Sequence, residues 1–118
     1  MIDMEQCRKL FCLFAMLPDA EPYTPLLDAA AAQCMSMLRP GADASDLRLC
    51  YFCAALANLR YVQMQAARCG VSHTYAGTVA RSHDAALPCS FAERLVQEYH
   101  AAAADLLTDR RLLLTGIG

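Results

Sequence analysis

A segment of nearly unbroken apolar residues, 49–57, lies at the centre of the sequence. We extend it to a helix over residues 45–69, with Ser45 or Asp43 as the N-terminal cap and Gly70 as the C-terminal cap. The first half of this helix is apolar almost all round, whereas its second half is amphipathic. A helix of this kind is buried on several sides, so we place it at the centre of a helical core.

Capping signals predict three further helices. Asp3 precedes the first, and Thr24 followed by Pro25 matches an N-cap with proline at the first helical position of the second. Ser90 and Glu93 form an S-x-x-E capping box before the last. Including the central one, the expected helices cover residues 4–17, 25–38, 45–69 and 91–107.

The length and composition agree with one helical domain. The chain has 118 residues, a mass of 12.9 kDa and 57% hydrophobic residues, which is enough for a single core. Alanine runs at 29–32 and 101–104 are expected where helices approach each other closely. We therefore predict an all-α fold: a four-helix antiparallel bundle-like domain over residues 1–118, with a long loop or small β-hairpin between the third and fourth helices.

The polar stretch 70–88 is the longest predicted connection. Compact domains rarely keep a gap of this length without a use for it. Two short β-prone runs, 72–75 and 78–81, flank Ala76-Gly77 and allow a hairpin. An isolated hairpin needs support from the helices or from a neighbouring subunit. The candidate subunit-contact or channel-lining residues are Ser72, His73, Thr74, Tyr75, Gly77, Val79 and Arg81.

The end of the chain, residues 110–118, reads RRLLLTGIG. It is basic and then apolar, and its two glycines disfavour helix. We expect a flexible, apolar tail that contacts another chain. The candidate contact residues are Arg110, Arg111, Leu112, Leu113, Leu114 and Ile117.

The seven cysteines do not form a recognisable ligand set. Cys50 and Cys53 form a CxxC inside an apolar helix, and we interpret them as core residues. The alternative is a metal or redox site that joins these two cysteines to histidines of the 70–88 stretch. For such a site the nearby residues His73, His83, Asp84, Cys69 and Cys89 match no standard zinc spacing. We expect no metal and no cofactor.

Other function classes lack their motifs. The chain has no nucleophile elbow and no glycine-rich phosphate loop, so we expect no enzymatic activity. Its net charge is −2 and its arginines are scattered, which disfavours a binder held by phosphates. No apolar run is long enough to span a bilayer, and the N-terminus is not typical of a signal peptide. We expect an intracellular protein with no membrane partner.

The order of these segments is similar to that of a known family. A short first helix is followed by PYTPLLDAAAA (22–32), RPGADASD (39–46), LCYFCAALANLRY (49–61) and SHTYAGTVARS (72–82), and an alanine-rich helix closes the chain. This pattern resembles small prophage proteins of the head-to-tail connector, or DNA-packaging adaptor, type. The chain departs from the family at Thr78: in the family, an acidic residue follows the glycine of this loop, whereas here a threonine follows Gly77.

The resemblance implies a non-enzymatic structural subunit. It would assemble into a homo-oligomeric ring between the portal and the tail or neck proteins, with the loop toward the channel and the tail on a neighbour. DNA would pass through such a ring without being read, and the protein would move from the bacterial cytoplasm into the virion. The alternative is a small helical protein-binding or regulatory module without enzymatic activity.

Overall fold

The computed structural model describes residues 2–72 and 78–108, and the side chains of residues 2–67 and 89–108. In this part of the chain the ordered elements are helical, apart from a single β-bridge between Leu38 and Leu107. The predicted all-α class is confirmed. The elements, in chain order, are α1 (Met4–Ala15), the 3-10 turn η1 (Glu21–Tyr23), α2 (Thr24–Ser36), α3 (Leu47–Ser72), α4 (Thr78–Ala102) and the 3-10 turn η2 (Ala104–Leu106).

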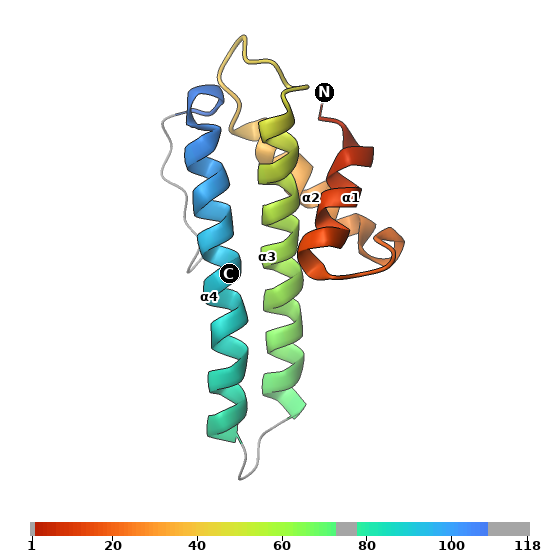
Figure 1. Ribbon diagram of the computed structural model, residues 1–118, viewed down its shortest axis with the longest axis vertical. Coiled ribbons are helices and arrows are strands. Elements are labelled where there is room, and N and C mark those ends of the chain that lie inside the picture. Colours follow the sequence, from red (N-terminus) through yellow and green to blue (C-terminus); the bar gives the residue numbers. More distant parts are fainter. Residues whose placement is uncertain (1, 73–77, 109–118) are drawn as a thin grey trace.

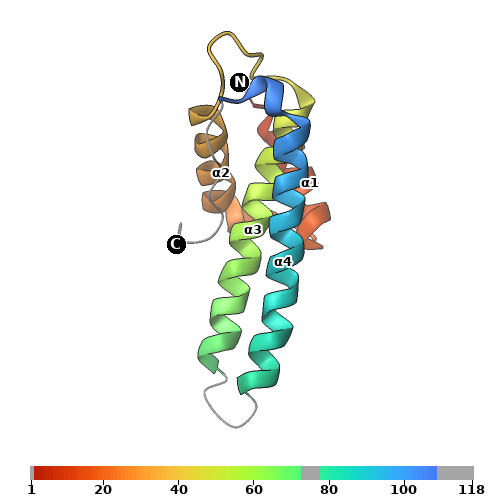
Figure 2. The same ribbon diagram turned by 90° about the vertical axis from the view of Figure 1, so that its left-hand side faces the viewer.

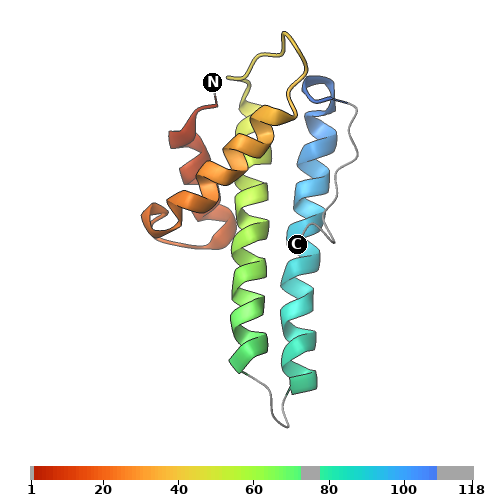
Figure 3. The same cartoon turned by 180° about the vertical axis from the view of Figure 1, so that it is seen from behind.

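The longest helices, α3 and α4, run antiparallel and lie side by side over most of their lengths (Figure 1). The shorter α1 and α2 pack against the N-terminal half of α3, with α1 in front of it and α2 behind it in that view (Figures 1 and 3). The view turned by 90° separates these two helices (Figure 2). The C-terminal half of α3 and the N-terminal half of α4 therefore extend beyond α1 and α2 as a pair.

The expected connection over residues 70–88 is wrong. Helix α3 continues to Ser72 and α4 already begins at Thr78, so the segment 78–88 is helical. The second β-prone run, 78–81, is thus the first turn of α4 and forms no strand. Local turn signals are overridden because each long helix provides a packing surface for the other along its length. The rest of the proposed hairpin, 73–77, lies outside the described residues.

The predicted start of the last helix is wrong for the same reason. Ser90 and Glu93 lie in the interior of α4, so they do not form a capping box. Pro88 also lies inside α4, where it removes one backbone hydrogen bond from the helix. The helix ends at Ala102 rather than at residue 107, and the chain continues through η2.

Other helix ends differ in detail from the predictions. Asp3 caps α1 as expected, since its Oδ1 accepts from the backbone N–H groups of Glu5 and Gln6 at 3.1 and 3.3 Å. The same helix ends at Ala15, where Met16 adopts a left-handed conformation (φ 56°). Thr24 is the first residue of α2 rather than its cap, and its hydroxyl donates to the carbonyl of Glu21 at 2.9 Å.

The core lies where α1, α2 and α4 surround the N-terminal half of α3. The central segment is buried as predicted, and three alanines of α3, Ala54, Ala55 and Ala57, let the other helices approach closely. Of the alanine runs 29–32 and 101–104, only Ala30 and Ala103 are buried. The largest fully buried side chains include Phe11, Phe52, Leu27, Leu49, Leu56, Leu59 and Val96.

Aromatic pairs tie the outer helices to α3. Phe11 of α1 meets Tyr61 of α3 edge to face, with ring centroids 6.0 Å apart, and Tyr23 lies 5.1 Å from Tyr61. Tyr99 of α4 stacks on Tyr51 of α3 at 5.2 Å. Such pairs add about 0.5–1.5 kcal/mol beyond the apolar area that they bury. Among the described helices, none is both long and apolar enough to cross a membrane.

Candidate functional site

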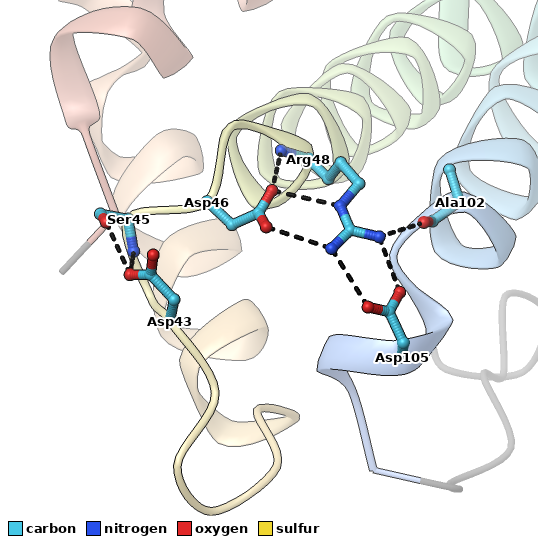
Figure 4. A network of polar contacts seen from close by, with 6 residues as sticks. All are labelled: Asp43, Ser45, Asp46, Arg48, Ala102 and Asp105. Carbon is cyan, nitrogen blue, oxygen red and sulfur yellow. Dashed lines mark hydrogen bonds and ion pairs between the residues drawn. The ribbon is translucent and has the colours of Figure 1, made fainter.

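A polar cluster joins the beginning of α3 to the end of α4 (Figure 4). The guanidinium of Arg48 donates to both carboxylate oxygens of Asp46, and its Nη1 lies 2.7 Å from Oδ1 of Asp105. Its Nη1 also donates to the carbonyl of Ala102 at 3.1 Å. All three guanidinium nitrogens thus have partners. Hydrogen bonds from Arg48 hold the pKa values of Asp46 and Asp105 below their usual range.

The cap of α3 belongs to this cluster. Asp46 Oδ1 accepts the backbone N–H of Arg48 at 2.9 Å, so Asp46 is the cap rather than Ser45 or Asp43. Those two residues form a turn of their own, in which the Ser45 hydroxyl donates to Asp43 at 2.6 Å. The hydrogen bonds from Ser45 lower the pKa of Asp43. The cluster of Asp46, Arg48 and Asp105 is therefore a polar joint between α3 and the end of α4, and its polar groups pair with one another within the chain.

Beside this joint, the chain after η2 is held against the end of α2. The N–H of Thr108 donates to the carbonyl of Met37 at 2.7 Å, and the N–H of Arg39 donates to the carbonyl of Leu106 at 2.9 Å. The Arg39 side chain also donates to the carbonyl of Leu107. These bonds fix the backbone of Leu106–Thr108, at the end of the described residues, beside the end of α2.

A different kind of surface lies halfway along α3. An open groove of about 390 Å³ runs between the end of α1, the middle of α3 and α4. Its rim has exposed apolar side chains: Met16 is 88% exposed and Phe91 is 58% exposed. Such side chains gathered around one groove are typical of a surface that a protein partner covers. The apolar lining includes Phe14 and Met16 beside α3, Tyr61 and Val62 on it, and Phe91 and Leu95 on α4.

One polar side chain lies in this apolar lining. Asn58 is only 6% exposed, and its Oδ1 is buried without a hydrogen-bond partner among the described residues. An unpaired buried polar group costs about 1–3 kcal/mol. The residue lines the groove, but Oδ1 itself has almost no accessible surface, so the amide has to turn toward the groove before a group there can pair with this oxygen.

A second, larger groove of about 650 Å³ lies between α1 and the chain that leads into α2. It mixes basic residues, Arg8 and Lys9, with the acidic residues Asp19 and Glu21. Because both charge signs are present, it selects no single class of charged ligand. We therefore treat the apolar groove as the candidate site.

Four cysteines gather in the core rather than at a surface. Cys7, Cys34, Cys50 and Cys53 are fully or almost fully buried free thiols. A hydrogen bond to Cys34, together with burial, raises the pKa of Cys53 to about 12. Burial raises the pKa of Cys50 to about 11, and a hydrogen bond to Cys53 with burial raises that of Cys7 well above its usual range. Since the thiolate is the ligand and the nucleophile, these protonated thiols suit packing.

The predicted alternative of a metal site finds no support in the described side chains. Among them, no group of three His, Cys, Asp or Glu residues could hold a metal ion. Cys89 is partly buried, and burial raises its pKa. His83 and Asp84 lie on α4 and Cys69 on α3, but their side chains are outside the described part, as is all of His73.

The residues predicted for subunit contact fall mostly outside the described chain. Ser72 ends α3, while Val79 and Arg81 belong to the first turn of α4. The structure thus separates these three between two helices. Outside the described residues lie His73, Thr74, Tyr75 and Gly77 of the proposed loop, and Arg110, Arg111, Leu112, Leu113, Leu114 and Ile117 of the tail.

The groove itself was not predicted from the sequence. Phe91 and Leu95 belong to the predicted helix 91–107, which alone gives no sign that both side chains line a groove or that Phe91 is mostly exposed. One signal could have indicated the groove: Asn58 follows the apolar run 49–57, and three of the residues three or four positions away on the helix, Ala54, Ala55 and Val62, have no polar side-chain group.

Comparison with known proteins adds no family assignment. The chain matches no protein-family model, no curated protein and no solved structure.

Proposed function

We propose that this protein is a structural subunit of a phage head-to-tail connector ring, through which DNA passes between portal and tail. The observation that carries the proposal is the apolar groove with exposed Phe91 and Met16 on its rim. Groups of this kind are buried when subunits assemble, because apolar and aromatic contacts dominate the centre of an interface. The subunit is non-enzymatic and needs no cofactor.

The helical architecture supports a role in assembly. The four helices serve as an antiparallel bundle-like unit, and the ends of α3 and α4 project beyond α1 and α2 (Figure 1). A projecting helix pair offers a long side for contact with a neighbour in a ring. The subunit contacts expected from the sequence within residues 72–81 and 110–117 stay predictions.

The charge of the chain is compatible with DNA passage. Its net charge is −2, so a channel built from such subunits would not grip phosphates strongly, and DNA could slide. The ring would contact portal protein on one side and tail or neck proteins on the other, and it would be part of the virion.

Electron microscopy and light scattering test the proposal. The purified chain, alone at high concentration and together with portal protein from the same phage, should form closed rings of uniform size. A chain that stays monomeric under both conditions would contradict the proposal. A genomic position between portal, capsid and tail genes would support it independently.

The alternative is a helical protein-binding or regulatory module without enzymatic activity. The observation that favours it is the size of the groove, which at about 390 Å³ suits one short segment of a partner. This function predicts a stable one-to-one complex and no ring, so the same light-scattering measurement separates the two proposals.

A further inference from the structure

The groove lacks two kinds of partner. No side chain in the described part of the chain covers its apolar lining, and Phe91 and Met16 are exposed at the rim. Its one buried polar residue, Asn58, lacks a hydrogen-bond partner among the described residues. An extended peptide segment supplies both, because its side chains fill the groove while its backbone N–H and C=O groups remain free to pair.

The end of this chain has that chemistry. Residues 109–118, DRRLLLTGIG, contain three consecutive leucines and one isoleucine. Glycines at 116 and 118 disfavour a helix, which leaves the backbone groups of an extended segment available for pairing. The segment therefore matches both the apolar lining and the unpaired amide.

Thr108, which forms the root of the tail, lies on a different side of the domain from the groove. The N–H of Thr108 donates to the carbonyl of Met37, which places the root beside the end of α2. Phe14 and Met16 place the groove beside the end of α1. Helices α1 and α2 lie on opposite sides of α3, in front and behind in Figures 1 and 3.

The closeness of the three leucines to Thr108 disfavours their insertion into the chain's own groove. Leu114 is six residues from Thr108, so it can lie at most about 20 Å away. Between Phe91 and Ala102, α4 alone spans about 17 Å along its axis, and the tail would also have to pass around the α3–α4 pair. The groove of a neighbouring copy requires no such path.

We propose that the groove between α1, α3 and α4 binds the C-terminal segment, residues 112–117, of a second copy of this chain. The leucines cover Phe91 and Leu95, the Asn58 amide turns toward the groove, and a backbone N–H of the segment donates to its Oδ1. Because the tail and the groove are different surfaces, each copy can offer its tail to the next, and such a head-to-tail contact forms a ring when the rotation between copies closes. The inference rests on the proposed ring function and names the contact that builds the ring.

Photo-crosslinking between two isotopically distinct copies tests this contact. The full-length chain carries p-benzoylphenylalanine at Phe91, an exposed position that tolerates the larger ring, and is mixed with ¹⁵N-labelled wild-type chain. After irradiation, mass spectrometry should find links from position 91 to residues 112–117 of the labelled copy. The matched control places the same photoreactive residue at Leu47, which is 53% exposed and lies outside the groove, and should give no link to the tail.

A variant of the labelled copy supplies the second control. The triple substitution Leu112→Ser, Leu113→Ser and Leu114→Ser should reduce the link by at least about tenfold, the factor expected for loss of a buried leucine contact. Thr115→Ser, which keeps the apolar side chains, should leave the link unchanged. Links confined to one chain, links to any other surface, or no link at all would overturn the proposal.

Electron microscopy of the same samples separates this inference from the ring function. Rings without links between position 91 and the tail would overturn the inference and leave the ring function standing. Links between position 91 and the tail of the other copy, in samples that form no rings even with portal protein, would support the contact and count against the ring function.

Discussion

Two polar side chains of α3, ten residues apart, differ in whether their hydrogen-bonding groups have partners. At the N-terminal end, each guanidinium nitrogen of Arg48 has a partner within the chain. In the middle, the Asn58 side-chain oxygen is buried without a partner in the described part of the molecule. The Arg48 joint is partly exposed and still fully paired, whereas a buried oxygen, which a folded chain normally pairs, is left without a partner at Asn58.

The same contrast holds for two phenylalanines. Phe11 of α1 is fully buried and contacts Tyr23 and Tyr61, whereas Phe91 of α4 is mostly exposed at the rim of the groove. The ring of Phe11 thus stabilises the folded monomer, whereas the ring of Phe91 is available to a partner. Substitutions at these positions should separate stability from assembly.

The largest effect on stability is expected at Phe11. Phe11→Ala removes a fully buried ring and leaves a cavity between α1 and α3, so the free energy of unfolding should fall by about 3–5 kcal/mol. Urea denaturation followed by circular dichroism measures this loss. A loss below about 1 kcal/mol would mean that α1 does not pack on α3 as described.

An opposite change is expected at Asn58. Asn58→Leu replaces the unpaired buried amide by an apolar side chain of similar size, so the free energy of unfolding of the monomer should rise by about 1–3 kcal/mol. Thermal and urea unfolding at low protein concentration measure the gain. Destabilisation by a similar amount would show that the amide is satisfied in the monomer.

Substitution of Phe91 should have almost no effect on the stability of the monomer. Phe91→Ser removes a side chain that is mostly exposed, so the free energy of unfolding should change by no more than about 0.5 kcal/mol. The same unfolding measurements apply, with Leu47→Ser as a matched substitution of another exposed apolar side chain. A loss comparable to that of Phe11→Ala would place Phe91 in the core instead.

At the polar joint we expect an effect that depends on pH. Asp46 and Asp105 have lowered pKa values because Arg48 hydrogen-bonds both. Each contributes stability above its unfolded pKa of about 3.9, and this contribution is lost as the pH falls through the lower folded value.

Arg48→Met removes these bonds, so the loss of stability on acidification below about pH 4 should become shallower than in the wild type. Unfolding curves measured across that pH range test this, with Lys9→Met at the exposed Lys9–Glu5 pair as the control. An unchanged pH profile in Arg48→Met would contradict the assigned cause of the pKa shifts.

Much of the fold could be predicted from local signals. The apolar segment of α3 and the Asp3 cap led to correct helices, because apolar periodicity and capping act over a few residues. Gly70 and Pro88 led to a wrong loop, because packing between two long antiparallel helices outweighed their local preferences. The groove could not be predicted because an apolar residue such as Phe91 fits the same helical pattern whether it packs within its own chain or against another chain.

The proposed ring requires the groove between α1, α3 and α4 to be a contact between subunits. Analytical ultracentrifugation over a range of concentrations compares the association of the wild type, Phe91→Ser and Leu47→Ser. We predict that the wild type associates, that Phe91→Ser weakens association by at least about tenfold, and that Leu47→Ser leaves it unchanged. Equal association of all three proteins, or equal weakening by both substitutions, would contradict the assignment of the groove.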